Sequence, residues 1–425
     1  MSGDTISLIF NSATAISIID FLWKVFVLLI PVFLGILAWR LWFNYVRHSY
    51  ISKTKWITLQ IKVPRDVFKT PQAMEFIFIN AMHQTYPSTW YPAYVKGVVR
   101  SWFSLEIASL GGKVYFFMHI PAFFKNLIES QIYAQYPRVE IMEVPDYTED
   151  VAARLETENW SMWGCEFKFK KPDAYPIKTY IDYGLDKVGS LEEEQKIDPI
   201  TPMMEYMGSL GPEEQAWFQV LVRASTQRFH KPGTWFGKQG WVDSARDEIK
   251  KISEKYAIKN EKGEKTVEYL KIPKSAQEEI EAINRSIDKL GYDVGIRALY
   301  LAKQKDFKEI NYVGLMSVVK QYNSGNLNGF SPTNITGFNY PWQDYTKRRA
   351  TKLKKEMFDA YRLRALFYPP HNRKFIAGNI LERRQMVLTS EELATIYHFP
   401  GQVAETPTFR RIESKKAEPP ANLPM

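Results

Sequence analysis

The chain has 425 residues, of which 45% are hydrophobic and 15% aromatic, and its formal net charge is +9. This composition favours folded domains over disorder, and the length suits two or three domains. The single cysteine, Cys165, excludes an intramolecular disulfide framework and a thiolate zinc site, while the positive charge suits an anionic partner such as a nucleic acid or a lipid surface.

The first predicted element, in residues 1–50, is a transmembrane helix that follows a short tail. No charged residue interrupts the sequence from Val25 to Trp39, and apolar character extends from Ile16 to Val46, which is enough to cross a hydrocarbon core. Tryptophans at both edges suit the two lipid interfaces, and a proline is tolerated inside a membrane helix. The residues assigned to the anchor are Trp23, Val25, Leu28, Pro31, Leu34, Leu37 and Trp39.

Two other interpretations compete with a membrane span. A signal peptide needs a basic start and a small-residue cleavage site, but Asp4 and Asp20 precede this apolar run and bulky residues follow it. A buried core helix is rarely this aromatic at both ends. The flank that begins at Arg40 is basic, so the positive-inside rule predicts a single-pass protein of the bacterial inner (cytoplasmic) membrane, with the N-terminus outside and the body cytoplasmic.

Residues 51–150 predict a ferredoxin-like β-α-β-β-α-β unit in an α+β body. Its first strand alternates apolar and polar residues, its other strands are strand-like runs, and its helices place apolar residues on one face. The expected elements are Trp56–Val63, Met74–Ala81, Val98–Ser109, Lys113–Ile120, Pro121–Ile132 and Val139–Val144. The dipeptide Gly111-Gly112 supplies the positive φ values that a tight hairpin turn needs.

The same order recurs in residues 151–335, which predict a second ferredoxin-like unit. The expected elements are Trp163–Lys170, Ile177–Tyr183, Pro202–Leu210, Ala216–Ala224, Val294–Lys303 and Tyr312–Val319. An insertion at about 241–290 contains two charged helices, and their narrow apolar stripes suit an antiparallel helical hairpin with an exposed tip at Lys259–Glu268. The hairpin is either a partner-docking element or a decorated loop.

Residues 336–387 form a basic helical segment, with a helix expected from Asp344 to Leu366. Its buried side would consist of Leu353, Met357, Tyr361 and Leu366. A nucleic acid or an acidic lipid surface is the partner that its cations would suit. The candidate contacts are Lys347, Arg348, Arg349, Lys352, Lys354 and Lys355. A solvated charged face is the competing interpretation.

The sequence contains no motif of an enzyme, so we expect no catalytic residue, metal or cofactor. The six histidines lack metal-ligand spacing, and neither HExxH nor GxSxG occurs. The nearest phosphate-loop candidate, Gly233–Gln239, has one spacer too few and lacks the hydroxyl that binds magnesium. The pairs Glu213-Glu214 and Glu391-Glu392 are adjacent, and we expect that two adjacent carboxylates cannot face one site on regular structure.

The last segment, residues 388–425, gives the functional expectation. Leu388–Gly401 reads LTSEELATIYHFPG, and SKKAEPPANLP follows at Ser414–Pro424. Thr389 or Ser390 can cap a short helix here. The segment resembles the one that precedes the motor domain in membrane-anchored conjugative-transfer ATPases of the type IV secretion, TraG-like and HerA/FtsK-related kind, and the stretches KVYFFMHIP and DPITPMMEYMGSLGPEEQAWFQVLVRAS resemble theirs as well.

This resemblance implies a non-catalytic, membrane-anchored component of a type IV secretion-like, conjugative DNA-transfer apparatus. In the ATPases a strand and a phosphate-binding loop follow the Pro-rich linker, whereas this sequence stops at Met425, so we expect either a separately encoded motor or a truncated product. The residues assigned to docking that ATPase are Leu393, Tyr397, His398, Phe399 and Pro400. We also expect a homo-oligomer. The alternatives are a nucleic-acid-binding membrane protein and a generic membrane scaffold.

Overall fold

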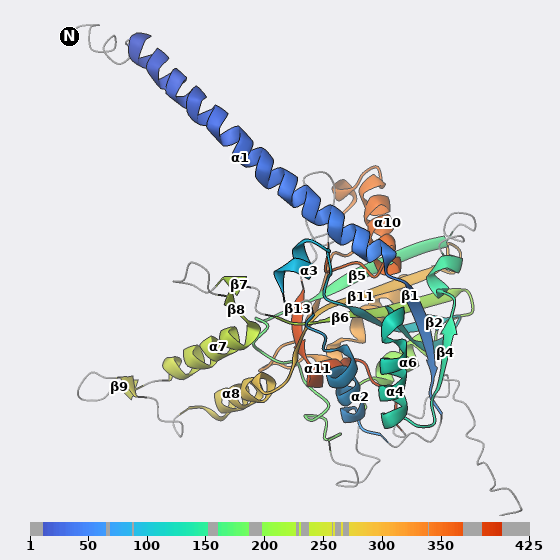
Figure 1. The fold of residues 1–425 in the computed structure, drawn as a ribbon. Coiled ribbons are helices and arrows are strands. Elements are labelled where there is room, and N and C mark those ends of the chain that lie inside the picture. Colours follow the sequence, from blue (N-terminus) through green and yellow to red (C-terminus); the bar gives the residue numbers. More distant parts are fainter. Residues whose placement is uncertain are drawn as a thin grey trace, which may run out of the picture. The chain divides into compact units, whose positions relative to one another are not determined.

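A computed structural model describes residues 12–64, 69–86, 89–151, 160–186, 198–226, 229–230, 238–256, 258–259, 265–266, 272–338, 340–368 and 385–401 (Figure 1). The chain divides into two compact units, one made of Met1–Thr54 and Pro87–Val99 and the other of Lys55–Tyr86 and Arg100–Met425. Each unit has its own internal contacts. The second unit, called the body here, has a mixed α+β fold built on an antiparallel sheet.

The first unit consists of one long apolar helix and one short helix. Helix α1 (Ser12–Lys53) contains the stretch Asp20–Lys53, which is long and apolar enough to cross a membrane and whose most apolar window has no buried residue. A signal sequence meets the same criterion of length and composition. Helix α3 (Trp90–Tyr94) packs against α1 through the ring of Tyr94.

The body is centred on a nine-stranded sheet in the order β12-β5-β11-β6-β2-β3-β1-β4, with β13 paired to β11. The strands are β1 (Trp56–Lys62), β2 (Phe103–Leu110), β3 (Lys113–Pro121), β4 (Glu140–Val144), β5 (Trp160–Phe169), β6 (Glu214–Ala224), β11 (Gly291–Lys303), β12 (Phe330–Thr333) and β13 (Met386–Thr389). Neighbouring strands in this sheet run antiparallel to one another. Strands β2 and β6 pair along their lengths, so the two halves of the sheet are continuous.

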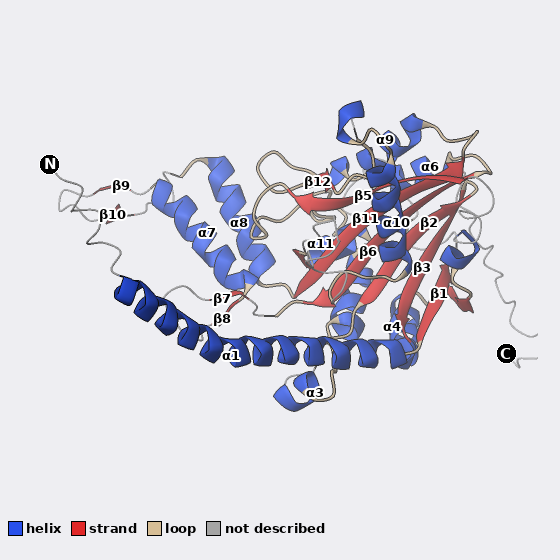
Figure 2. Ribbon diagram, turned by 90° about the horizontal axis from the view of Figure 1, so that it is seen from above, coloured by secondary structure: helices blue, strands red, loops and turns tan. Residues whose placement is uncertain are grey.

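Helices cover both faces of this sheet (Figure 2). The larger core lies beneath α2 (Gln72–Ile77), α4 (Lys125–Gln135), α6 (Thr201–Gly208), α9 (Glu309–Ser317) and α11 (Ser390–Ile396). The opposite face is covered by α10 (Arg348–Arg362), whose apolar side contacts Trp217 and Leu299. Short π and 3-10 turns occupy Phe78–Met82, Ala122–Phe124, Lys320–Tyr322 and Pro341–Gln343.

The insertion between β6 and β11 forms the expected helical hairpin. Helices α7 (Trp241–Lys255) and α8 (Lys274–Ile287) lie side by side beyond the strands in both views (Figures 1 and 2). Their seam includes Ala245, Ile252 and Ile283. Two-residue strands flank or join these helices: β7 (Phe229–His230), β8 (Lys238–Gln239), β9 (Ile258–Lys259) and β10 (Lys265–Thr266). Most of the expected tip lies outside the described residues, as does the rejected phosphate-loop candidate apart from Lys238 and Gln239.

Most predicted elements of the body occur within a few residues of their expected bounds. The Gly111-Gly112 turn has φ values of +62° and +78°, as a tight hairpin requires. The strand expected from Val98 begins only at Phe103, because the preceding residues up to Val99 belong to the other unit. The basic helix begins at Arg348 and not at Asp344.

One predicted strand, Ile177–Tyr183, is wrong, because this segment forms turns. Two of its backbone N–H groups donate to side chains of the C-terminal segment instead of to a neighbouring strand. The N–H of Ile177 donates to Glu392 Oε1 at 2.9 Å, and the N–H of Tyr180 donates to Thr395 Oγ1 at 2.9 Å. The apolar residues that suggested a strand are nevertheless largely buried.

Candidate functional site

The segment that carries the family resemblance is built into the body. Strand β13 pairs with β11 from Gly291 opposite Thr389 to Val294 opposite Met386. Every residue of α11 is buried, and α11 packs against α2. We call residues 386–401 the C-terminal clamp, because they join the β11 half of the sheet to the α2 half.

A capping box starts α11 within the clamp. The Thr389 side chain accepts a hydrogen bond from the N–H of Glu392 at 3.3 Å, and the Glu392 carboxylate accepts one from the N–H of Thr389 at 2.8 Å. This reciprocal arrangement satisfies two backbone donors that a helix start otherwise leaves unpaired. The predicted cap at Thr389 is therefore confirmed.

The adjacent carboxylates of Glu391 and Glu392 are both buried and both contact the turn segment 177–182. Thr179 Oγ1 donates to Glu391 Oε1 at 2.6 Å, while Ile177 N–H donates to Glu392 Oε1. The two adjacent carboxylates therefore reach one segment of the chain, although each accepts from a different residue of it. Burial raises the pKa of Glu391, and it raises the pKa of Glu392 to about 7.

His398 holds the end of the clamp. Its Nε2 lies 2.8 Å from Asp198 Oδ1, and its Nδ1 lies 2.8 Å from the carbonyl oxygen of Ala394. Both partners are hydrogen-bond acceptors, so each ring nitrogen of His398 faces an oxygen atom. Burial alone raises the pKa of Asp198, but the His398 charge and hydrogen bonds outweigh it and the net pKa is lowered.

Glu75 of α2 connects the clamp to the first half of the sheet. Its Oε1 accepts hydrogen bonds from Ser390 Oγ and Lys289 Nζ, each at 2.8 Å, and its Oε2 accepts one from Tyr180 at 2.8 Å. Charged groups are costly to bury unless they are paired and hydrogen-bonded. These bonds therefore pair the buried carboxylate of Glu75 and fix the position of the clamp against α2.

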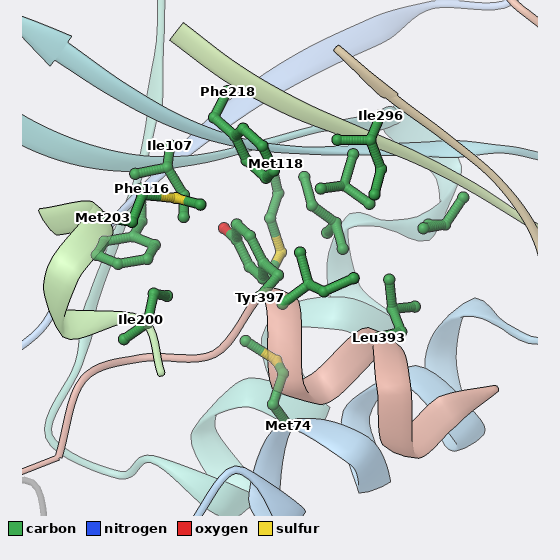
Figure 3. Packing of buried hydrophobic residues seen from close by; sticks show 14 of the residues in the cluster. Met74, Ile107, Phe116, Met118, Ile200, Met203, Phe218, Ile296, Leu393 and Tyr397 are labelled. Carbon is green, nitrogen blue, oxygen red and sulfur yellow. The ribbon is translucent and has the colours of Figure 1, made fainter. Parts of the chain in front are cut away.

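The residues assigned to docking lie in the clamp and are buried in the body. Leu393, Tyr397, His398 and Phe399 are each at most 1% exposed, and Pro400 is buried. Figure 3 shows Leu393 and Tyr397 pointing into the core with Met74 and Phe116. In this arrangement a partner has no access to these side chains. The sequence that follows, including the Pro-rich tail, lies outside the described residues.

The opposite face of the sheet holds a second buried network, around Arg364. Arg364 donates from Nε to Glu106 Oε1 at 3.0 Å and from Nη2 to Asp146 Oδ1 at 3.0 Å. Tyr147 and Gln219 also donate to Glu106, at 2.8 and 3.0 Å. Burial raises the pKa of Glu106, but Arg364 outweighs burial and the net pKa is lowered. This network attaches the end of α10 to β2 and β6.

The predicted basic surface lies at the start of α10. Five of the six assigned cations are exposed, whereas Lys354 is half-buried and burial lowers its pKa. The predicted buried residues Leu353, Met357, Tyr361 and Leu366 do lie inward. Two exposed aromatic side chains that sequence reasoning did not single out lie in the residues just before α10, with Trp342 75% and Tyr345 90% exposed.

The anchor residues have the exposure that a lipid-facing helix requires. Trp23, Leu28, Leu34, Leu37 and Trp39 are between 42% and 70% exposed. Pro31 is exposed too, and Val25 is half-buried. An apolar surface this large is unfavourable in water.

Two observations on the described part of the chain concern metal ions and small molecules. Within it, no three His, Cys, Asp or Glu side chains are placed to hold a metal ion. A cavity of about 190 Å³ is lined by Glu166, Arg297 and Asn334 among others. The Arg297 guanidinium there already donates to Glu166, Gln219 and backbone carbonyls, so the chain itself satisfies this cation.

Residues 50–411 match the family model DUF8128, which is described as a domain of unknown function. The match covers most of the chain, including the whole nine-stranded sheet and the clamp, so the chain belongs to the DUF8128 family. No curated protein matches it.

Proposed function

We propose that this protein is a single-pass, non-catalytic membrane component that holds a separately encoded TraG-like or HerA/FtsK-type ATPase in a type IV secretion-like DNA-transfer apparatus. The anchor is α1, which would cross the bacterial inner membrane with the N-terminus outside and the body in the cytoplasm. The exposure of its large apolar side chains supports this role, because a bilayer is the solvent that suits them.

We also infer that the body consists of two ferredoxin-like units. The first half of the sheet has the order β4-β1-β3-β2, and the second has the order β12-β5-β11-β6. In chain order both read fourth, first, third and second strand, with helices following the first and third strands. This shared order supports two copies of one motif joined through β2 and β6. A rigid, doubled platform suits a homo-oligomeric support.

The observation that carries the proposed tether is the burial of the clamp. The segment that resembles the one preceding the motor domain is seated by His398, Glu391 and Glu392, so the sequence after Gly401 starts from a defined point of the body. The buried clamp residues would then position the tether, and the Pro-rich residues that follow would contact the ATPase. This moves the proposed docking surface from the HFP residues to 402–425.

Truncation after Gly401 tests the tether. We expect the full chain, solubilised in detergent, to retain the HerA/FtsK-type ATPase of the same organism, and the truncated chain to lose most of it because the contact residues are gone. The control is a third chain in which the order of residues 402–425 is shuffled, since this change preserves their charge and proline content. Equal thermal stability of all three chains would show that the body is intact. Undiminished ATPase recovery by the truncated chain would rule out the tether.

A second candidate function is binding of single-stranded nucleic acid at the start of α10. The exposed rings of Trp342 and Tyr345, just before α10 in the chain, and the five exposed cations support it, because base stacking and phosphate pairing together characterise such surfaces. An ordinary charged helix, such as those of the α7–α8 hairpin, presents cations to solvent but lacks such a pair of exposed rings.

Charge reversal tests this second function. Replacing Lys347, Arg348 and Arg349 with glutamate should lower affinity for an oligothymidylate at least tenfold and reduce the salt slope by about one for each cation that no longer pairs with a phosphate. The matched control reverses Lys250, Lys251 and Lys255 on α7 in the hairpin, which removes equal charge. If both triple variants bind like the wild type, α10 is not a nucleic-acid site.

A further inference from the structure

The short helix α3 carries an unusual group of exposed aromatic residues. Trp90 is 69% exposed, Tyr91 50% and Tyr94 42%, and the following Val95 is 44% exposed. None of the five described residues of α3 is buried. Three aromatic rings in one turn of an otherwise unburied helix form a surface that is poorly suited to water.

This helix is held against one particular stretch of α1. The ring of Tyr94 stacks on Phe43 with 4.9 Å between ring centroids and on Trp39 with 6.3 Å. A few residues on, Gly97 has a φ of +67°, and a Cβ atom there would lie 2.4 Å from the carbonyl oxygen of Val46. Only glycine tolerates both the conformation and the close approach.

The stretch of α1 that α3 contacts is the end of the proposed span. A hydrocarbon core of about 30 Å accommodates about 20 helical residues. Counting from the Asp20–Lys24 ion pair at one end, that length reaches Arg40. Trp39 and Phe43 therefore fall at the lipid headgroups, and α3 is stacked on them at the same depth.

We propose that α3 is a second membrane contact, with Trp90, Tyr91 and Tyr94 inserted among the phospholipid headgroups at the C-terminal end of the span. Amphipathic rings favour this zone, where the ring is shielded and its polar group remains hydrated. Lys96, whose Nζ lies 5.6 Å from the Tyr91 ring centre, suits the lipid phosphates. The inference rests on the proposed membrane anchor and adds that the bilayer holds the first unit at two points, which limits rotation of α1.

Single-cysteine labelling of the full chain in phospholipid vesicles tests the inference. The native Cys165 is fully buried, and burial raises the pKa of its thiol well above the usual range, so it stays unlabelled. An environment-sensitive fluorophore is placed at Tyr91→Cys, at Leu34→Cys in the span, and at Tyr133→Cys, an exposed position on α4 of the body. Nitroxide lipids then quench the fluorophore from either the headgroup region or the bilayer centre.

We expect the label at position 91 to lose most of its emission to the shallow quencher, the label at 34 to the deep quencher, and the label at 133 to neither. If position 91 behaves like 133 while 34 is quenched, α3 is not a membrane contact and the anchor stands. If 34 is not quenched, the anchor itself fails.

A variant that acts on the contact between α3 and α1 gives a second measurement. Gly97→Ala places a Cβ against Val46 and strains the backbone, so it should free α3 from α1. Shallow quenching of a label at Trp90→Cys should then fall by more than half, while quenching at position 34 is unchanged. Unaltered quenching at position 90 would contradict the role of α1 in holding α3 at the headgroups.

Discussion

Replacing Arg364 with methionine should lower the free energy of unfolding by about 3–5 kcal/mol, because it leaves the buried carboxylate of Glu106 without its cation. Glu106 is fully buried and receives two of the Arg364 donors, from Nε at 3.0 Å and from Nη2 at 3.2 Å. Methionine fills most of the same volume. Arg364 has a φ of +48°, and methionine meets the same backbone restriction, so the loss reports chiefly on charge.

The pH dependence of this variant should have the opposite sign to that of the wild type. In the wild type the pKa of Glu106 lies below its usual 4.5, so its contribution to stability is present above pH 4.5 and is lost as the pH falls through the lowered value. Without Arg364, burial dominates and the pKa of Glu106 rises above 4.5. The variant should therefore gain stability as the pH falls from about 7 to about 5, a range in which this group leaves the wild type unchanged.

Denaturant unfolding of detergent-solubilised protein at several pH values measures both effects. Arg362→Met is the matched control, because Arg362 lies on the exposed side of α10 and its pairing with Asp359 is at 4.0 Å; it should cost less than about 1 kcal/mol. Adding Glu106→Gln to Arg364→Met should recover part of the loss by removing the orphaned charge. A cost for Arg364→Met no larger than that of the control would refute the structural role of this network.

Replacing His398 with phenylalanine should cost a similar amount, about 3–5 kcal/mol, and should loosen the clamp. The change removes the donor that lies 2.8 Å from Asp198, and that carboxylate remains buried. Because Ala394 loses its bond as well, amide hydrogen exchange in α11 should become faster than in the central strands. The measurement combines global unfolding with hydrogen exchange of the clamp.

A second histidine provides the comparison. His119 stacks on Trp56 at 5.4 Å and lies 2.9 Å from the hydroxyl of Thr58. Burial, together with the Arg364 charge, lowers the pKa of His119 to about 4, so the ring is neutral at pH 7. Replacing this ring therefore leaves no buried charge without a partner. His119→Phe should cost only about 1 kcal/mol. If His398→Phe costs no more than this, the pairing with Asp198 does not hold the clamp.

Sequence patterns formed by residues close together in the chain predicted most of their secondary-structure elements correctly. Period-two alternation located β1, apolar runs located β6 and β11, the Gly-Gly pair located the β2–β3 hairpin, and paired stripes located the α7–α8 hairpin. The cap at Thr389 followed in the same way from the glutamate three residues later. Such signals work because the interacting atoms are separated by one turn or one strand.

The interactions of the site were mostly missed because their partners are remote in sequence. Glu106 and Arg364 are 258 residues apart, and His398 and Asp198 are 200 apart. One signal was available for the first pair, since Glu106 lies between Leu105 and Ile107 in a strand with almost every residue buried, and a carboxylate there needs a partner. The aromatic run Trp90–Tyr94 is likewise visible in the sequence, whereas its packing on α1 is not.

The sequence alone established a long apolar helix, an α+β body, a basic helix and a capped C-terminal segment, because composition and short-range periodicity determine these. Only the tertiary structure decided that the C-terminal segment is buried in the body and not displayed on it. It also decided that Glu391 and Glu392 both contact the turn segment 177–182, and that α3 packs on the end of α1. The physical reason is that burial and pairing depend on which distant segments meet, and no local pattern encodes that.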